Sequence, residues 1–135
     1  MSLTFGKVST LVIAAVLMAA PAAARAPIAR IVKFTNECSH PIEFIIRHTE
    51  KGGSWDSHGW YNLRPWQSST FSDGGYTLTQ ADGYSLYFYA RATDGSGVEW
   101  TGDNQQSFGQ ATYPFMEMNT AVGSDGQLKA RITCD

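Results

Sequence analysis

The side chains best suited to chemistry or recognition gather in residues 55–66, which read Trp-Asp-Ser-His-Gly-Trp-Tyr-Asn-Leu-Arg-Pro-Trp. Aromatic rings stack on flat apolar groups, and Trp and Tyr are enriched at interaction hot spots. An exposed group of such rings would mark a binding face for a carbohydrate or for an envelope protein. The same rings, Trp60 above all, can instead fill the core of a small domain. The candidate binding residues are Trp55, His58, Trp60, Tyr61 and Trp66.

The three histidines, His40, His48 and His58, raise the question of a metal site. No two of them stand at the short sequence spacings that are typical of zinc ligands. The nearest carboxylates, Glu50 and Asp56, fall in expected turns. Solvated or core-edge histidines therefore account for the pattern best, and the sequence predicts neither a metal site nor a cofactor.

The sequence offers no catalytic constellation. Residues 95–97 read Gly-Ser-Gly, a turn signal, whereas a nucleophile elbow needs Gly-x-Ser-x-Gly. Glu99 and Asp103 are two carboxylates, but Asp103 belongs to a polar loop, where such pairs arise by chance. No glycine-rich loop leads into a helix, so nucleotide binding has no support. We therefore expect no catalytic residues and no enzyme activity.

Two cysteines, Cys38 and Cys134, stand near opposite ends of the domain. Two thiols without a Cys-x-x-Cys spacing, in a chain with an export signal, predict a structural disulfide. Closing a loop of this length stabilises a fold by about 4–5 kcal/mol in the chain-entropy model, against a typical total of about 5–15 kcal/mol.

The N-terminus supplies the export signal. Lys7 precedes an apolar run over residues 8–20, and the small residues at 21–24 fit cleavage after Ala24. The run is shorter than the roughly 20 residues that a membrane-spanning helix needs. We expect residues 1–24 to be a cleaved signal peptide and residues 25–135 to be one exported domain, periplasmic or secreted, without stable membrane insertion.

The elements that position these side chains are predicted strands. Period-2 alternation, β-branched and aromatic residues, and turns with Gly or Pro recur along the mature chain, and no stretch shows a sustained helical period. The strongest predicted strand covers residues 84–92, whereas residues 102–110 are predicted to form a polar loop. The pattern indicates an all-β fold, a single small β-sandwich or partly closed barrel of about seven to eight antiparallel strands.

A set of motifs runs through most of the mature domain. It consists of Asn36, Cys38, Pro41 and Ile42, then Trp55, Gly59, Trp60, Tyr61, Leu63 and Pro65, and finally Tyr87, Phe88, Tyr89, Ala90, Trp100 and Gly102. Together these motifs resemble the bacterial family called domain of unknown function 1036. The family carries Gly and then Cys after the central proline, where this chain has Trp66 and Ser68. The resemblance implies a small exported β-rich domain and supplies neither an established activity nor a catalytic residue.

The net negative charge of the chain bears on which partners it can bind. Without Lys7 the chain carries nine Lys and Arg residues against 12 Asp and Glu residues, so nucleic acid is not an expected partner. The favoured function is a non-catalytic binding or interaction module of the periplasm or cell envelope that uses the aromatic residues. Two alternatives stay open: a structural or envelope-associated accessory protein, and a small hydrolase or inhibitor acting on envelope polymers. The sequence does not determine the oligomeric state.

Overall fold

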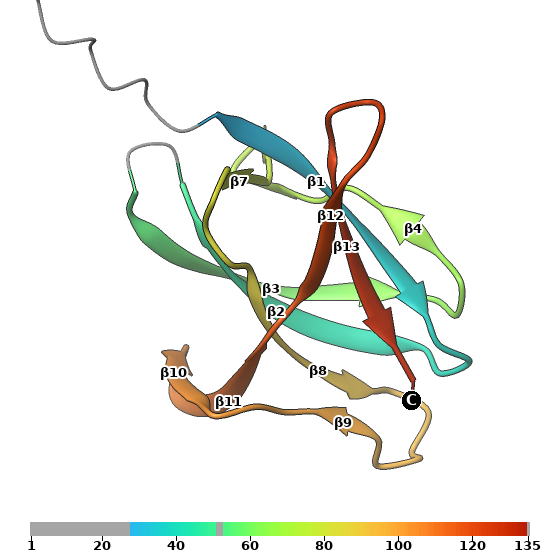
Figure 1. Cartoon of the computed structure of the whole chain (residues 1–135). Helices are drawn as coiled ribbons and strands as arrows, with labels where there is room; N and C mark the ends of the chain where they lie inside the picture. Colours follow the sequence, from blue (N-terminus) through green and yellow to red (C-terminus); the bar gives the residue numbers. More distant parts are fainter. Residues whose placement is uncertain (1–27, 51–52, 135) are drawn as a thin grey trace, which may run out of the picture.

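The computed structural model describes residues 28–50 and 53–134, and the regular secondary structure of this part consists of strands (Figure 1). The predicted all-β class is thereby confirmed. The predicted signal peptide, residues 1–24, lies outside the described residues. Within the described ranges, no helix has the length and apolar character needed to cross a membrane.

Thirteen strand segments follow one another along the described residues, and several of them are only two or three residues long. They are β1 (Ala29–Glu37), β2 (Ile42–Thr49), β3 (Trp55–Leu63), β4 (Ser68–Ser69), β5 (Ser72–Asp73), β6 (Tyr76–Thr77), β7 (Thr79–Ala81), β8 (Tyr87–Ala92), β9 (Glu99–Trp100), β10 (Asn104–Phe108), β11 (Ala111–Glu117), β12 (Asn119–Val122) and β13 (Leu128–Thr133).

Two curled sheets face each other and enclose the core (Figure 1). The first sheet has the order β12-β13-β1-β4, with β7 paired to the beginning of β1. The second has the order β10-β11-β8-β2-β3, with β9 beside β8, and β5 and β6 form a separate hairpin. The first and last strands, β1 and β13, lie side by side in parallel, whereas the other pairs among the described strands are antiparallel.

The predicted disulfide joins the ends of these two parallel strands. Cys38 follows β1 and Cys134 follows β13, and their Cα atoms are 5.1 Å apart across a sequence separation of 96. The side chain of Trp100 adds a second link, because its Nε1 donates a hydrogen bond of 2.7 Å to the carbonyl of Thr133. Both links hold the C-terminal strand against the rest of the domain.

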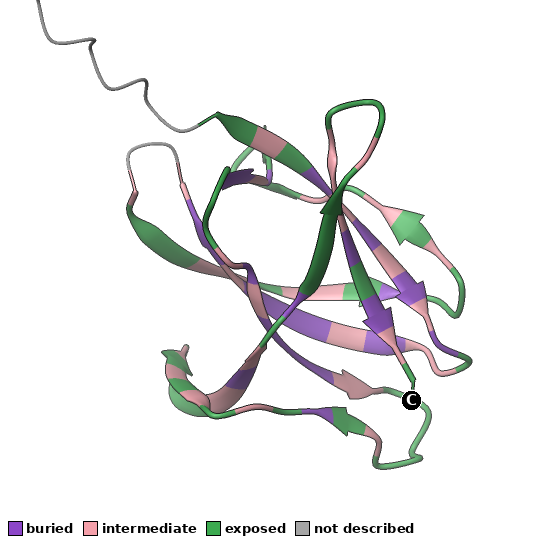
Figure 2. Ribbon diagram, viewed as in Figure 1, coloured by how far each residue is buried: buried purple, intermediate pink, exposed green. Residues whose placement is uncertain are grey.

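The main core lies between the two sheets, where the buried residues of Figure 2 face one another. Strand β2 shows why its sequence folds this way: Ile42, Phe44 and Ile46 alternate along the strand and all point into this core. Phe34 of β1 meets Phe44 across the core with ring centroids 5.3 Å apart.

The second sheet also has a small apolar cluster on its outer face. Ile45, one residue from Phe44 and therefore on the opposite face of β2, is fully buried there with Tyr89 and Phe115. The hairpin of β10 and β11 covers this apolar cluster. It can approach so closely because Gly102 has no side chain: a Cβ there would lie 2.5 Å from the carbonyl oxygen of Phe115.

Two segments differ from the sequence-based prediction. Residues 102–110, predicted as a polar loop, contain strand β10, and β12 forms where no strand was predicted. Both are edge strands with mainly polar or exposed residues, so they lack the apolar alternation that indicates a strand. Backbone pairing with β11 and β13 defines them instead. The strand predicted over residues 84–92 begins at Tyr87.

Candidate functional site

Strand β3 divides the predicted binding residues between the two faces of the second sheet. Trp55 and Trp60 lie on the outer face, the side of the smaller apolar cluster. His58 and Tyr61 lie on the inner face, the side of the main core. Trp66 belongs to the turn after β3. The structure therefore does not gather these five residues on one face.

The change of face occurs at Gly59. The register between β2 and β3 shifts between Phe44 and Ile46, so β3 carries one extra residue opposite Ile45. A Cβ on Gly59 would lie 3.1 Å from the Cα atom of Ile45, which is tight against backbone. Because of the extra residue, Trp55 and Trp60 share a face although their separation in sequence is odd.

A groove opens on this outer face beside Trp55. It has a volume of about 240 Å³ and is lined by Arg47, Trp55, Tyr87, Asn104 and Gln106. The rings of Trp55, 38% exposed, and Tyr87 are tilted by 53° with centroids 5.8 Å apart. The guanidinium of Arg47 lies 5.7 Å from the Trp55 ring, and Gln106 Nε2 donates a 2.7 Å hydrogen bond to Asn104 Oδ1. The groove thus combines ring surfaces with amide and guanidinium groups.

Trp60, the second tryptophan of the outer face, packs into the apolar cluster. Its ring lies edge-on to those of Tyr89, Phe108 and Tyr113. The guanidinium of Arg91 lies over it at 4.3 Å and donates a 2.5 Å hydrogen bond to Glu43 Oε1, which raises the pKa of Arg91. These contacts make Trp60 a half-buried packing residue of the outer cluster, outside the main core between the sheets.

Tyr61 and Trp66 have contrasting surroundings. Tyr61 packs against Phe44 and Phe71, and burial, followed by the charge of Asp73, raises its pKa. Trp66 is 68% exposed at a φ of 62° and has no ring contact among the residues that the structure describes. Tyr61 therefore supports the core, and Trp66 stands alone on the surface.

A pocket of about 500 Å³ opens at the inner edge of the sheet, between the ends of β2 and β3 and the strands β5 to β7. Two histidines and three carboxylates are part of its lining: His48, Glu50, Asp56, His58 and Asp73. The strand register brings the histidines together, because His48 pairs with Asp56 and Ile46 pairs with His58. The two imidazoles are thus diagonal neighbours on one face of the strand pair.

The contacts in this pocket, which we call the histidine pocket, are short. The imidazole rings of His48 and His58 meet at 4.9 Å between centroids. Glu50 Oε1 lies 3.7 Å from the Nε2 atom of each histidine. His58 also contacts Asp73 Oδ2 through Nδ1 at 2.7 Å and Asp56 Oδ2 through Nε2 at 3.2 Å. One ligand-type atom from each of His48, Glu50 and His58 falls within 4.8 Å of the other two.

Strand β7 fixes the end of β2 that carries His48. The Nδ1 atom of His48 lies 2.5 Å from the carbonyl oxygen of Thr79. The buried side chain of Gln80 accepts a 2.7 Å hydrogen bond from the backbone N–H of Thr49. Its amide nitrogen donates to two carbonyls of the following turn, at 3.0 Å each. The histidine pocket is therefore held by strands of both sheets.

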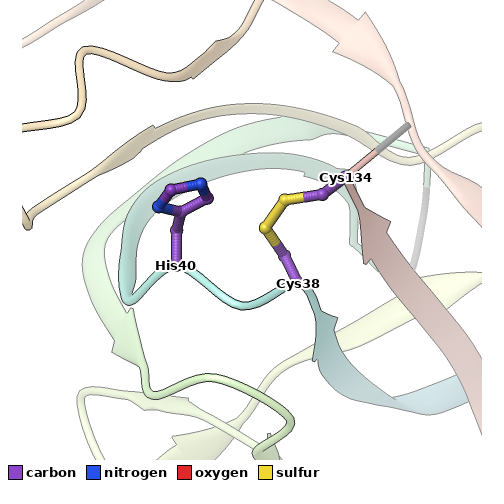
Figure 3. A group of neighbouring side chains, drawn as sticks. All are labelled: Cys38, His40 and Cys134. Carbon is purple, nitrogen blue, oxygen red and sulfur yellow. A yellow bond between two sulfur atoms is a disulfide. The ribbon is translucent and has the colours of Figure 1, made fainter.

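The third histidine, His40, lies beside the disulfide (Figure 3) and precedes β2, whereas His48 stands near the other end of that strand. Its Nδ1 atom is 2.6 Å from Asp94 Oδ2. Hydrogen bonds from Ser96, and then from His40, hold the pKa of Asp94 well below its usual range. Because Cys38 and Cys134 are bonded to each other, they offer no thiolate ligand next to His40.

Most of the residues that line the outer groove and the histidine pocket were not predicted as site residues from the sequence. Asn104 and Gln106 lay in the predicted loop, and Arg47 and Tyr87 carried no signal apart from their alternation in predicted strands. For the histidine pocket, the pairing of His48 with His58 depends on the register of β2 and β3. Placing these two predicted strands as an antiparallel pair would have brought the histidines near each other, and would have directed attention to the neighbouring carboxylates.

Comparison of the chain with protein-family models, with curated proteins and with solved structures finds no match.

Proposed function

We propose that this chain is an exported, non-catalytic binding protein of the periplasm or cell envelope that recognises carbohydrate in the outer groove. The observation that carries the proposal is the composition of the groove, in which Trp55 and Tyr87 expose ring surface beside Arg47, Asn104 and Gln106. The groove, with about 240 Å³, is smaller than pockets for drug-sized ligands, which span about 300–1,000 Å³, and suits a short glycan segment.

The lining matches the two kinds of surface that a sugar presents. The ring faces of Trp55 and Tyr87 offer apolar area for the C–H face of a pyranose. The amides of Asn104 and Gln106 both donate and accept hydrogen bonds, and the Arg47 guanidinium donates them, so together they can satisfy hydroxyl groups.

Export is supported by two independent features. The Cys38–Cys134 disulfide fits an oxidising compartment, since cytosolic thiols are kept reduced. The N-terminal segment, residues 1–24, has the pattern of a cleaved signal peptide. A binding protein in that compartment meets envelope polymers directly.

The experiment is a titration of the purified chain with a glycan array and with isolated cell-envelope fractions, read by tryptophan fluorescence. The Trp55→Ala and Tyr87→Ala variants should lose binding, because each removes one ring surface of the groove. Trp66→Ala is the matched control: it removes an exposed tryptophan outside the groove and should bind as the parent chain does.

The outcomes separate this proposal from its alternatives. Binding that is retained in Trp55→Ala would reject the outer groove as the site. Binding to envelope fractions that persists after their polysaccharide is digested would identify a protein partner instead. If neither array nor fractions bind, the chain is better explained as a structural or envelope-associated accessory protein.

One observation favours a second candidate function, a small hydrolase acting on envelope polymers. His58 lies in the histidine pocket, where His48 and three carboxylates surround it. Acid–base groups converging in a pocket are the first requirement of a hydrolytic site. Release of soluble fragments from envelope polymers by the parent chain, and its loss in His58→Ala, would establish this activity.

A further inference from the structure

The Nε2 atoms of His48 and His58 are buried and make no hydrogen bond to any part of the chain that the structure describes. His48 is only 2% exposed, so water does not readily replace the missing partner. Asp56 Oδ2 approaches His58 Nε2 to 3.2 Å but does not have the geometry of a hydrogen bond. A buried polar atom without a partner costs free energy, so two of them side by side require an explanation.

The other nitrogen of each ring determines what these Nε2 atoms present. The carbonyl oxygen of Thr79 can only accept, so the Nδ1 atom of His48, 2.5 Å away, carries a proton and donates it. The Nδ1 atom of His58 forms an ion-pair contact of 2.7 Å with Asp73 Oδ2, which can only accept, so the proton of this ring is favoured on Nδ1 as well. In each neutral imidazole the lone pair is then on Nε2. Both Nε2 atoms lie on the side where His48, Glu50 and His58 approach one another in the histidine pocket.

This arrangement is the one that metal-ligating histidines adopt. Such a histidine donates its remaining N–H to a carbonyl or a carboxylate, which fixes the tautomer and orients the ring toward the metal. Thr79 supplies the carbonyl for His48, and Asp73 supplies the carboxylate for His58. Strands β7 and β5 therefore orient two ligands that β2 and β3 carry.

A carboxylate completes the ligand set. Glu50 Oε1 is 3.7 Å from both Nε2 atoms, and Asp56 Oδ2 stands next to His58. Ligand atoms of a tetrahedral zinc ion, bound at about 2.0–2.2 Å, lie roughly 3.4 Å from one another. Glu50 follows the last residue of β2 and is half-exposed, so a small movement of its side chain corrects its own distances, and the two Nε2 atoms, within 4.8 Å of each other, also approach when the ion binds.

Charge and donor type both select the ion. Three carboxylates share the pocket with two imidazoles, so a divalent cation would offset their mutual repulsion. Imidazole nitrogen suits zinc and its transition-metal neighbours, whereas Ca²⁺ and Mg²⁺ prefer oxygen ligands throughout.

We propose that His48, Glu50 and His58 bind Zn²⁺, with Asp56 beside the open position and with Thr79 and Asp73 orienting the two imidazoles. The site lies on the inner side of the sheet and is independent of the outer groove. It links β2, β3 and Glu50 to the separate β5–β6 hairpin through Asp73, so the bound ion also stabilises the attachment of this hairpin to the second sheet.

The test is calorimetric titration of the purified, chelator-treated full chain with ZnCl₂ and, in parallel, with CaCl₂. We expect one Zn²⁺ per chain, weak or absent Ca²⁺ binding, and a rise in the melting temperature with zinc. The variants are His48→Asn and His58→Asn. An asparagine amide can retain the hydrogen bond that Nδ1 donates while it removes Nε2, so these variants are expected to fold, which far-UV circular dichroism checks.

Each variant should weaken Zn²⁺ binding by more than about 100-fold, which exceeds the effect of changing an outer hydrogen-bond partner. His40→Asn is the matched control, because it removes the one histidine outside the pocket and should bind zinc as the parent chain does. The proposal is overturned if the parent chain binds no zinc, if folded His48→Asn and His58→Asn bind it unchanged, or if Ca²⁺ binds as tightly as Zn²⁺.

Discussion

The outer groove and the histidine pocket lie on opposite faces of the same pair of strands, β2 and β3, and they are built in different ways. In the groove, the polar groups belong to half-exposed or exposed side chains that contact mainly one another. In the pocket, His48 is buried and is anchored to the backbone of β7. The difference indicates that one face is suited to an adaptable polar ligand, and the other to a small ion with fixed geometry.

Removal of a buried side chain from either face of β2 tests whether the two faces belong to one cooperative unit. Phe44 supports the pocket side and its neighbour Ile45 supports the groove side, and both are fully buried. Phe44→Ala should destabilise the fold by about 3–5 kcal/mol and Ile45→Ala by about 2–5 kcal/mol, because each leaves a cavity. Urea unfolding followed by tryptophan fluorescence and by circular dichroism measures both changes.

We expect a single unfolding transition in each variant, with the two probes coinciding. Two separated transitions would show that the groove and the pocket unfold as independent units. The groove and the pocket would then belong to two small folding units and not to two faces of one sheet.

Features that depend on local pattern could be predicted from the sequence, whereas the assignment of side chains to the two faces of β3 could not. The all-β class, the core alternation of β2 and the disulfide follow from local pattern and cysteine count, since these depend on residues close in sequence or on simple pairing. The division of the aromatic block could not be predicted in this way. It depends on the extra residue at Gly59, which reverses the alternation between Trp55 and Trp60.

The histidine pocket illustrates the same limit. His48 and His58 belong to different strands, and Asp73 and Thr79 come from a hairpin and an edge segment that pattern alone does not place. Their proximity follows from the β2–β3 register and from the pairing of β7 with β1. Non-local pairing of this kind is the information that a single sequence carries most weakly.

Replacing Asp73 tests how the histidine pocket orients its zinc ligands. Asp73→Asn should weaken Zn²⁺ binding by about 10–100-fold, because the amide no longer fixes the His58 imidazole as firmly as a carboxylate does. Binding of carbohydrate in the outer groove should not change. Calorimetry with ZnCl₂ and fluorescence titration with the glycan measure the two affinities. Asp103→Asn, which removes an exposed carboxylate outside both regions, is the charge-matched control.

A smaller effect is expected from the groove side. Gln106→Ala removes one side-chain amide from the lining and should weaken carbohydrate binding by about 0.5–1.5 kcal/mol, the usual contribution of a neutral hydrogen bond. Zinc affinity should stay the same. Gln105→Ala is the matched control, since Gln105 is exposed and adjacent residues of a strand point to opposite faces. Equal losses in both variants would argue against a specific amide contact in the groove.

The smallest effect concerns two tyrosines, one on each side of the sheet. Burial raises the pKa of Tyr61 and of Tyr89, and the next contribution comes from Asp73 for Tyr61 and from Glu99 for Tyr89. Because the unfolded chain ionises first, the stabilising contribution is present below about pH 10 and is lost as the pH rises through the folded-state pKa.

Urea unfolding between about pH 8 and pH 11 should therefore show a free energy of unfolding that falls above about pH 10. Tyr61→Phe and Tyr89→Phe should each reduce this fall. The carboxylates distinguish the two faces: Asp73→Asn should lower the pKa of Tyr61 and leave that of Tyr89 unchanged, whereas Glu99→Gln should do the reverse. Ultraviolet absorbance of tyrosinate in Tyr61→Phe and Tyr89→Phe backgrounds assigns each titration. If Asp73→Asn shifts both tyrosines equally, the electrostatic separation of the two faces is wrong.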